Sequence, residues 1–222
     1  MFQIKICGIT SPNDARVAVE AGADAIGLNF YDKSPRHVTV AAAADIARSV
    51  PGDVTIVGVF VNATAERIAK ITGEVGLDAV QLHGDEPPEL IAELGEDFRI
   101  VRARRLSPRG LAEIAEDLNA CAKRGSRRPD AVLLDANVTG QYGGTGSKLP
   151  WSNLTDYCRW LDPTPMILAG GLRPENVAEA IGLVRPSGVD VASGVEDAPG
   201  VKSPEKMRLF IQAAREAFAS AD

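Results

Sequence analysis

Residues 2–8 have the sequence FQIKICG, a short apolar run that ends in a glycine. Seven further runs of this kind recur along the chain, and a longer amphipathic stretch follows each one. The eight runs are residues 2–8, 24–30, 55–61, 78–84, 98–103, 130–135, 165–171 and 188–194. Nearly continuous apolar runs are typical of parallel strands whose two faces are both covered, so the pattern predicts repeated strand-then-helix units.

Eight such units in 222 residues predict an α/β fold, namely a single TIM (β/α)8 barrel of the phosphate-binding type. We expect residues 1–222 to form one domain. An open doubly wound sheet is the alternative, but a chain this short favours closure. Signals for helix starts fall where this alternation of strands and helices requires them. Proline follows Ser11 and Arg173, as is common in the first turn of a helix, and residues 62–64 and 85–87 offer polar caps before helical stretches.

The net charge of −6 and the pI near 5.1 argue against nucleic acid or an anionic membrane surface as the main partner. A small anionic substrate fits, because backbone amides and one or two arginines can hold it. Three cysteines, no leader-like segment and no apolar run of about 18 residues predict a cytoplasmic protein without a membrane span. A monomer and a homodimer both remain open.

Strand alternation assigns the side chains of residues 4–7 to two faces. Ile4 and Ile6 suit the face covered by helices, which leaves Lys5 and Cys7 pointing into the barrel. Cys7 is then highest, at the mouth, and an inward Lys5 requires an anionic partner. Cys7 could be a small apolar filler, but its place at the end of a strand favours a catalytic thiol. Lys5 is the nearest candidate to activate it.

Asp135 ends the run at 130–135 and shares strand parity with Ala131 and Leu133. It should therefore face the same mouth as Cys7 from the opposite side. Two roles are open on position alone: a cap for the amides of the following loop, or a general acid.

Glycines follow the last three strands, in GGTG (143–146), AGG (169–171) and SG (193–194). The loops after strands seven and eight commonly bind phosphate in such barrels. The candidate phosphate-binding residues are Gly144, Gly146, Gly170, Gly171, Ser193 and Gly194.

A long loop after the second strand contains SPRHV (34–38), where Arg36 could grip a planar carboxylate or remain a solvated surface residue. Gln81 and His83 share a face at the end of the fourth strand and are candidate orienting groups. The two histidines of the chain are far apart in sequence, so we expect no metal site.

These motifs, in this order and over essentially the whole length, resemble the phosphoribosylanthranilate isomerase family of tryptophan biosynthesis. The resemblance rests on KICGIT, SPRHV, QLHGDE, LLD followed by GGTG, LAGGL, SGVE and PGVK. It implies a cofactor-independent Amadori rearrangement of a phosphorylated small molecule. In that reaction Asp135 is the general acid, Cys7 is the base, Arg36 binds the anthranilate carboxylate and the glycine loops bind phosphate.

Two rivals share parts of this pattern. The histidine-pathway relatives use an aspartate on the first strand, where this chain has Cys7. A barrel that only binds a phosphorylated metabolite would require neither Cys7 nor Asp135, so the presence of both favours an enzyme.

Overall fold

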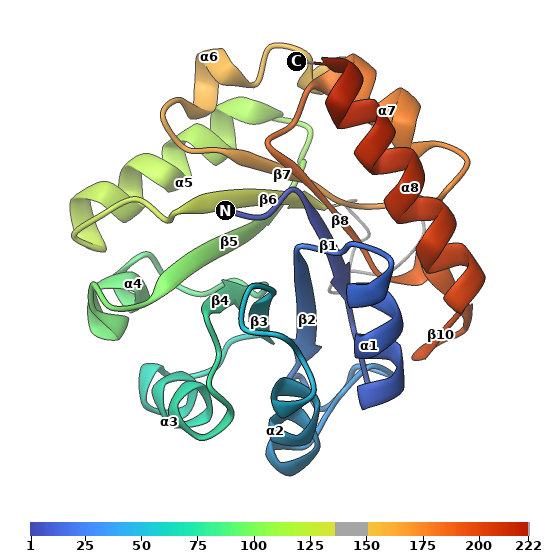
Figure 1. Ribbon diagram of the computed structural model, residues 1–222. Helices are drawn as coiled ribbons and strands as arrows, with labels where there is room; N and C mark the ends of the chain where they lie inside the picture. The colour runs from blue at the N-terminus through green and yellow to red at the C-terminus, as the bar shows by residue number, and fades with distance from the viewer. Residues whose placement is uncertain (136–150, 222) are drawn as a thin grey trace.

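All eight predicted strands form a closed parallel barrel in the computed structural model, which describes residues 1–135 and 151–221 (Figure 1). The open sheet is excluded because β8 pairs with β1, with Lys5 opposite Asp190. The barrel strands are β1 (Ile4–Cys7), β2 (Ala25–Asn29), β3 (Thr55–Phe60), β4 (Ala79–Leu82), β5 (Arg99–Arg105), β6 (Ala131–Asp135), β7 (Met166–Leu168) and β8 (Gly188–Val191).

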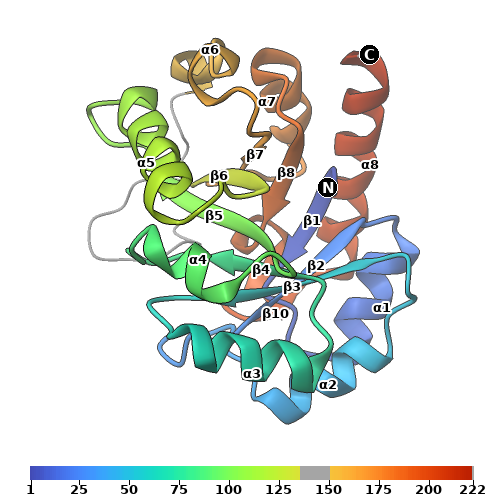
Figure 2. The ribbon, with the colours of Figure 1, turned by 90° about the vertical axis from the view of Figure 1, so that its left-hand side faces the viewer.

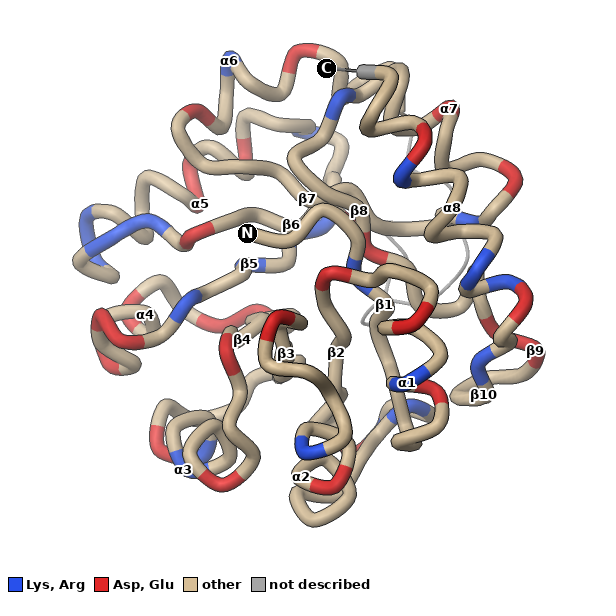
Figure 3. The backbone as a smooth tube through the Cα atoms, in the orientation of Figure 1, with Lys and Arg blue, Asp and Glu red and all other residues tan. Residues whose placement is uncertain are grey.

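Helices surround the barrel on the outside, as the ribbon seen from two sides shows (Figures 1 and 2). They are α1 (Pro12–Glu20), α2 (Val40–Arg48), α3 (Ala65–Val75), α4 (Glu89–Leu94), α5 (Leu111–Arg124), α6 (Cys158–Leu161), α7 (Val177–Val184) and α8 (Pro204–Ala221), with 3-10 turns η1 (Trp151–Leu154) and η2 (Ser193–Val195). Acidic and basic residues are interspersed over these helices (Figure 3).

A small antiparallel hairpin, which the sequence did not predict, lies between β8 and α8. Its strands are β9 (Glu196–Ala198) and β10 (Val201–Lys202). Strands this short carry too few residues to show an alternating pattern.

The barrel wall separates two apolar clusters, as strand parity predicted. Ile4 and Ile6 are fully buried in the large cluster between the strands and the helices. Ala131 and Leu133 belong to a second cluster inside the barrel. Lys5 and Cys7 also lie on the inner side, and both are buried. The prediction that Lys5, Cys7 and Asp135 share the inner face is therefore confirmed.

Local helix signals were partly right. Ser11 caps α1 by accepting a hydrogen bond from the Asp14 amide, with Pro12 next to it. Thr64 caps α3, which ends at Gly76 in the left-handed conformation. The start after Arg173 was wrong, because α7 begins only at Val177. A helix does follow residues 85–87, but α4 begins at Glu89 without the side-chain cap that these residues predicted.

Aspartates just before β2, β4 and β6 bind the strand that precedes each of them. Asp24 accepts from the amides of Gln3 and Ile4, at 3.1 and 2.8 Å. Asp78 and Asp130 accept in the same way from Ile56 and Ile100, at 2.8 and 2.7 Å. The chain therefore uses the same contact before three of its strands to satisfy backbone amides at the amino-terminal end of the barrel.

We expect Asp24→Ala to lower the free energy of unfolding by about 1–3 kcal/mol, because it leaves strand amides without their acceptor. Chemical denaturation measures this change. Asp53→Ala removes an exposed carboxylate near the same end and should change stability by no more than about 0.5 kcal/mol. Equal stability of the two variants would contradict the role assigned to Asp24.

Candidate active site

A cavity at the carboxyl ends of the strands brings together most of the predicted site residues. Its lining includes Cys7, Arg36, His83, Asp135, Gly170, Gly171, Ser193 and Gly194. Lys5 and Gln81 lie beneath it and are fully buried. Gly144 and Gly146 lie outside the described residues. Parallel strands deliver their last residues to one rim, which is why segments distant in sequence meet here.

Cys7 stands above a buried ion pair. The Lys5 ammonium donates to Asp190 Oδ1 at 2.7 Å, and neither side chain is more than 7% exposed. Lys5 also lies close enough to the Cys7 thiol for its positive charge to act on it. On β2, Gly27 leaves the space that the thiol occupies, because an added Cβ would lie 2.8 Å from Cys7 Sγ. The thiol is therefore fixed between a cation and a glycine.

Burial raises the pKa of the Cys7 thiol above its ordinary value, and the neighbouring Asp190 carboxylate raises it too. Lys5 and Lys202 act in the opposite direction but do not prevail. The expectation that Lys5 activates Cys7 is thus right in sign and insufficient in size. The physical reason is that desolvation of the buried thiol outweighs its attraction to Lys5, and the Asp190 carboxylate opposes that attraction as well.

His83 faces Asp135 across the mouth. Its Nε2 lies 3.4 Å from Asp135 Oδ2, while its Nδ1 lies 2.7 Å from Gln81 Nε2. With Gln81 donating to Nδ1, His83 carries its proton on Nε2 and directs it toward Asp135. Gln81 and His83 therefore share one face at the end of β4, as the sequence predicts, and of the two only His83 lines the cavity.

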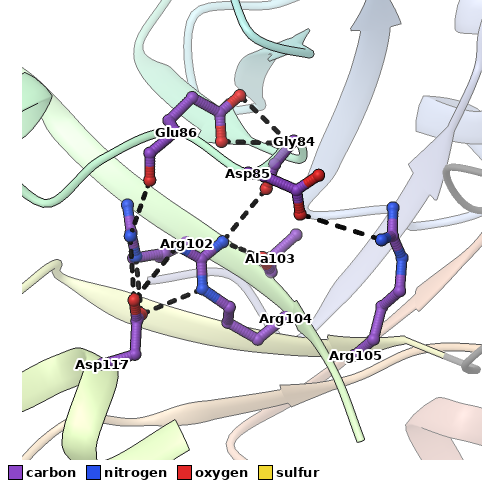
Figure 4. A network of polar contacts seen from close by, with 8 residues as sticks. All are labelled: Gly84, Asp85, Glu86, Arg102, Ala103, Arg104, Arg105 and Asp117. Carbon is purple, nitrogen blue, oxygen red and sulfur yellow. Dashed lines mark hydrogen bonds and ion pairs between the residues drawn. The ribbon is translucent and has the colours of Figure 1, made fainter. Parts of the chain in front are cut away.

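The loop that carries His83 is held by a polar network (Figure 4). Arg102 and Arg104 both bind Asp117, and they donate to the carbonyl oxygens of Glu86 and Gly84, at 2.9 and 3.2 Å. The Glu86 carboxylate in turn accepts from the Gly84 amide. These contacts fix the backbone next to His83.

The loops after β7 and β8 pack against each other at glycine. Gly170 and Gly171 have φ of 86° and 70°, a conformation that other residues rarely adopt. An added Cβ on Gly194 would lie 1.8 Å from the Leu172 carbonyl oxygen, so this close approach requires glycine. The result is a concave, backbone-lined end of the cavity, which is a suitable shape for an anion.

Arg36 lies on the other side of Cys7 and is paired with a carboxylate of the chain itself. Its Nε and Nη2 each donate to Glu196 at 2.7 Å. Lys202, fully buried, donates to the same Glu196 at 2.9 Å. The interpretation of Arg36 as a solvated surface residue is excluded, since its side chain is only 11% exposed.

Comparison with known proteins agrees with this arrangement. The family model for N-(5'-phosphoribosyl)anthranilate isomerase matches residues 4–213. The chain belongs to this family. The N-(5'-phosphoribosyl)anthranilate isomerase of Geotalea daltonii is 46% identical over 99% of this chain and its own full length, and that of Magnetococcus marinus is 48% identical over 97% of this chain and 96% of its own.

Solved structures of family members have the same fold. The Thermotoga maritima isomerase is 40% identical with a TM-score of 0.83, and the match covers 97% of this chain and all of that one. A family member in complex with reduced 1-(o-carboxyphenylamino)-1-deoxyribulose 5-phosphate is 38% identical with a TM-score of 0.80, at the same coverage.

Sequence reasoning missed three charged residues of this family member's site: Asp190, Glu196 and Lys202. Asp190 was implied, because an inward Lys5 required an anionic partner and GVDV offers an aspartate at an inward position. Glu196 and Lys202 stand in the motifs SGVE and PGVK, but no local pattern says that they contact Arg36. Only the fold brings them there.

Within the described ranges, no three His, Cys, Asp or Glu side chains lie together as metal ligands would. The helices of those ranges include none with the length and apolarity of a membrane span. Cys121 and Cys158 both stand in stretches that the sequence predicts to be helical, where ordinary packing is the expected role of a cysteine. Cys121 is buried in α5 and agrees with this expectation, whereas Cys158 is exposed and contradicts it.

We expect the alkylation rate of Cys7 by iodoacetamide to rise with pH and to reach half its maximum above the value of about 8.5 of an unperturbed thiol. The reason is that the thiolate reacts and that burial disfavours it. The measurement uses Cys158→Ser, which removes the exposed thiol, with mass spectrometry of the Cys7 peptide. A midpoint below 8.5 would contradict the raised pKa.

Proposed function

We propose that this chain converts N-(5'-phosphoribosyl)anthranilate into 1-(2-carboxyphenylamino)-1-deoxyribulose 5-phosphate in tryptophan biosynthesis, in the cytoplasm. The observation that carries the proposal is that Cys7 and Asp135 line one cavity between a glycine-lined end and an arginine. An isomerisation between adjacent carbons requires one base and one acid, and it needs neither a redox cofactor nor a metal.

The substrate has two anionic ends, and the cavity offers a place for each. Its phosphate would rest on the amides around Gly170, Gly171, Ser193 and Gly194. Gly144 and Gly146 remain further candidates, outside the described residues. The anthranilate carboxylate would bind Arg36, which lines the same cavity. Binding both ends places the ribose between Cys7 and Asp135.

The reaction takes two proton transfers, at the ring oxygen and at C2, before a last step in which C1 gains a proton and the C2 hydroxyl loses one. Asp135 protonates the ring oxygen, and the nitrogen lone pair opens the ring to a protonated Schiff base. Cys7, as thiolate, removes the proton on C2, and the electron pair moves toward the iminium nitrogen. The resulting enolamine tautomerises to the ketone. Because a nearby positive charge favours a thiolate, the iminium lowers the pKa of Cys7 when the base is required. His83 would orient Asp135 throughout.

We expect Cys7→Ser and Asp135→Asn each to lower kcat by roughly 10²- to 10⁴-fold, because each removes one proton-transfer group. Circular dichroism should show the fold unchanged. Cys158→Ser and Asp53→Asn make the same chemical changes away from the cavity and should keep full activity. Near-normal turnover by Cys7→Ser would remove the proposed base.

Arg36→Ala should raise KM more than it lowers kcat, because the carboxylate contact is made in both the ground state and the transition state. Steady-state kinetics measure both constants. An unchanged KM would exclude Arg36 from carboxylate binding.

The decisive experiment follows the fluorescence decay of freshly generated phosphoribosylanthranilate with purified protein. Decay well above the spontaneous rate supports the function, and decay at the background rate rejects it. Size-exclusion chromatography with light scattering would separate the monomer from the homodimer. Phosphoribosylanthranilate isomerase of Thermotoga maritima has been described as dimeric, which makes a homodimer worth testing.

A further inference from the structure

The β9–β10 hairpin, which the proposed mechanism leaves without a role, packs against the loop of Arg36. At the hairpin turn, Gly200 has a φ of 82°, and an added Cβ would lie 2.6 Å from the Pro35 carbonyl oxygen. Thr10, just after β1, donates to the Gly200 carbonyl oxygen at 3.1 Å. The hairpin is therefore fixed against the residue next to Arg36.

The hairpin presents Glu196 to one edge of the guanidinium. Glu196 takes the edge formed by Nε and Nη2, and each contact measures 2.7 Å. Among the described residues this leaves Nη1 and the second proton of Nη2 without an acceptor, and they form the other edge suited to a planar carboxylate. On its remaining side the Arg36 stem lies on Gly8, where an added Cβ would lie 2.4 Å from Arg36 Cδ. Glu196 and Gly8 together therefore fix the direction of the Nη1–Nη2 edge of Arg36.

Lys202 holds Glu196 in turn. It lies opposite Glu196 in the hairpin, and it donates to Glu196 Oε1 and to the Ala192 carbonyl oxygen, both at 2.9 Å. Arg36, Glu196 and Lys202 together form what we call the Arg36 triad. The triad has two positive charges and one negative charge, so its net charge is +1. Because the triad is buried, this charge requires an anionic partner, and one carboxylate of a ligand would neutralise it.

We propose that Glu196, held by Lys202, is a positioning residue that turns the free edge of Arg36 toward the cavity and so makes the site select an aromatic amine that carries a carboxylate. The proposal rests on the proposed function, because it assigns the selection for the anthranilate carboxylate to that same site. Glu196 acts through Arg36 and does not touch the ligand.

The test compares two ligands by isothermal titration calorimetry. One is reduced 1-(o-carboxyphenylamino)-1-deoxyribulose 5-phosphate, and the other is the same compound without its carboxyl group. Glu196→Gln keeps the size of the side chain and removes its charge. The affinity for the carboxylated ligand should fall by about 10- to 100-fold, and the affinity for the carboxyl-free ligand should fall by less than about 3-fold. The carboxyl-free ligand also reports that the site is folded.

Three further variants sharpen the result. Asp197→Asn makes the same kind of change at the exposed neighbouring residue, whose partner is Lys206, and should leave both affinities unchanged. Arg36→Met and the double variant Arg36→Met/Glu196→Gln should bind the carboxylated ligand equally, since Glu196 acts only through Arg36. If Glu196→Gln does not fold, Glu196→Asp is measured in its place. It should lower the affinity for the carboxylated ligand by a smaller factor and leave the affinity for the carboxyl-free ligand unchanged.

The proposal is overturned if Glu196→Gln lowers the affinity for both ligands equally or for neither. It is also overturned if the affinity losses of the two single variants add up in the double variant. So would failure of the unaltered protein to prefer the carboxylated ligand. Failure of the proposed function is a separate outcome, namely no turnover of phosphoribosylanthranilate by the unaltered protein. The binding comparison gives its answer whether or not turnover occurs.

Discussion

The ion pair between Lys5 and Asp190 lies at the seam where the barrel closes. These residues are direct neighbours on β1 and β8, at the two ends of the chain's strand order. A buried ammonium without its carboxylate would cost several kcal/mol, so the inward Lys5 is tolerable only when β8 has closed the sheet. The charge of the same lysine acts on the thiol of Cys7, whose pKa it lowers. Closure of the barrel and construction of the site are therefore one event.

The charges around Cys7 lie in ion pairs, which offset one another in part. Lys5 pairs with Asp190, and Lys202 shares Glu196 with Arg36, so the two carboxylates oppose part of the effect of the cations on the thiol. Burial of the thiol then has the largest effect on its pKa, which it raises. The raised pKa favours the protonated thiol, and in the proposed reaction the positive charge of the substrate's iminium would favour the thiolate.

Rigid loops carry the rest of the site. The mouth is formed by segments whose backbones are held by specific contacts: the polar network behind Gly84, the glycine contact between Gly194 and Leu172, and the hairpin that packs on Pro35. At the opposite end, aspartates before alternate strands bind the strand amides. In the described part of the chain, the strand ends thus hold the proposed catalytic groups, and specific contacts hold these loops, which places the groups of the site precisely.

The sequence by itself determined the barrel, its phasing and the inward placement of Lys5, Cys7 and Asp135, because apolar runs and strand parity are local properties that survive in any fold with these strands. It also placed Gln81 beside His83, only two residues away. The tertiary structure alone decided the partners of the charges. Glu196 meets Arg36 across 160 residues of sequence, and Asp190 meets Lys5 across 185. It also decided the pKa of Cys7, because desolvation depends on everything packed around the thiol and no local pattern records it.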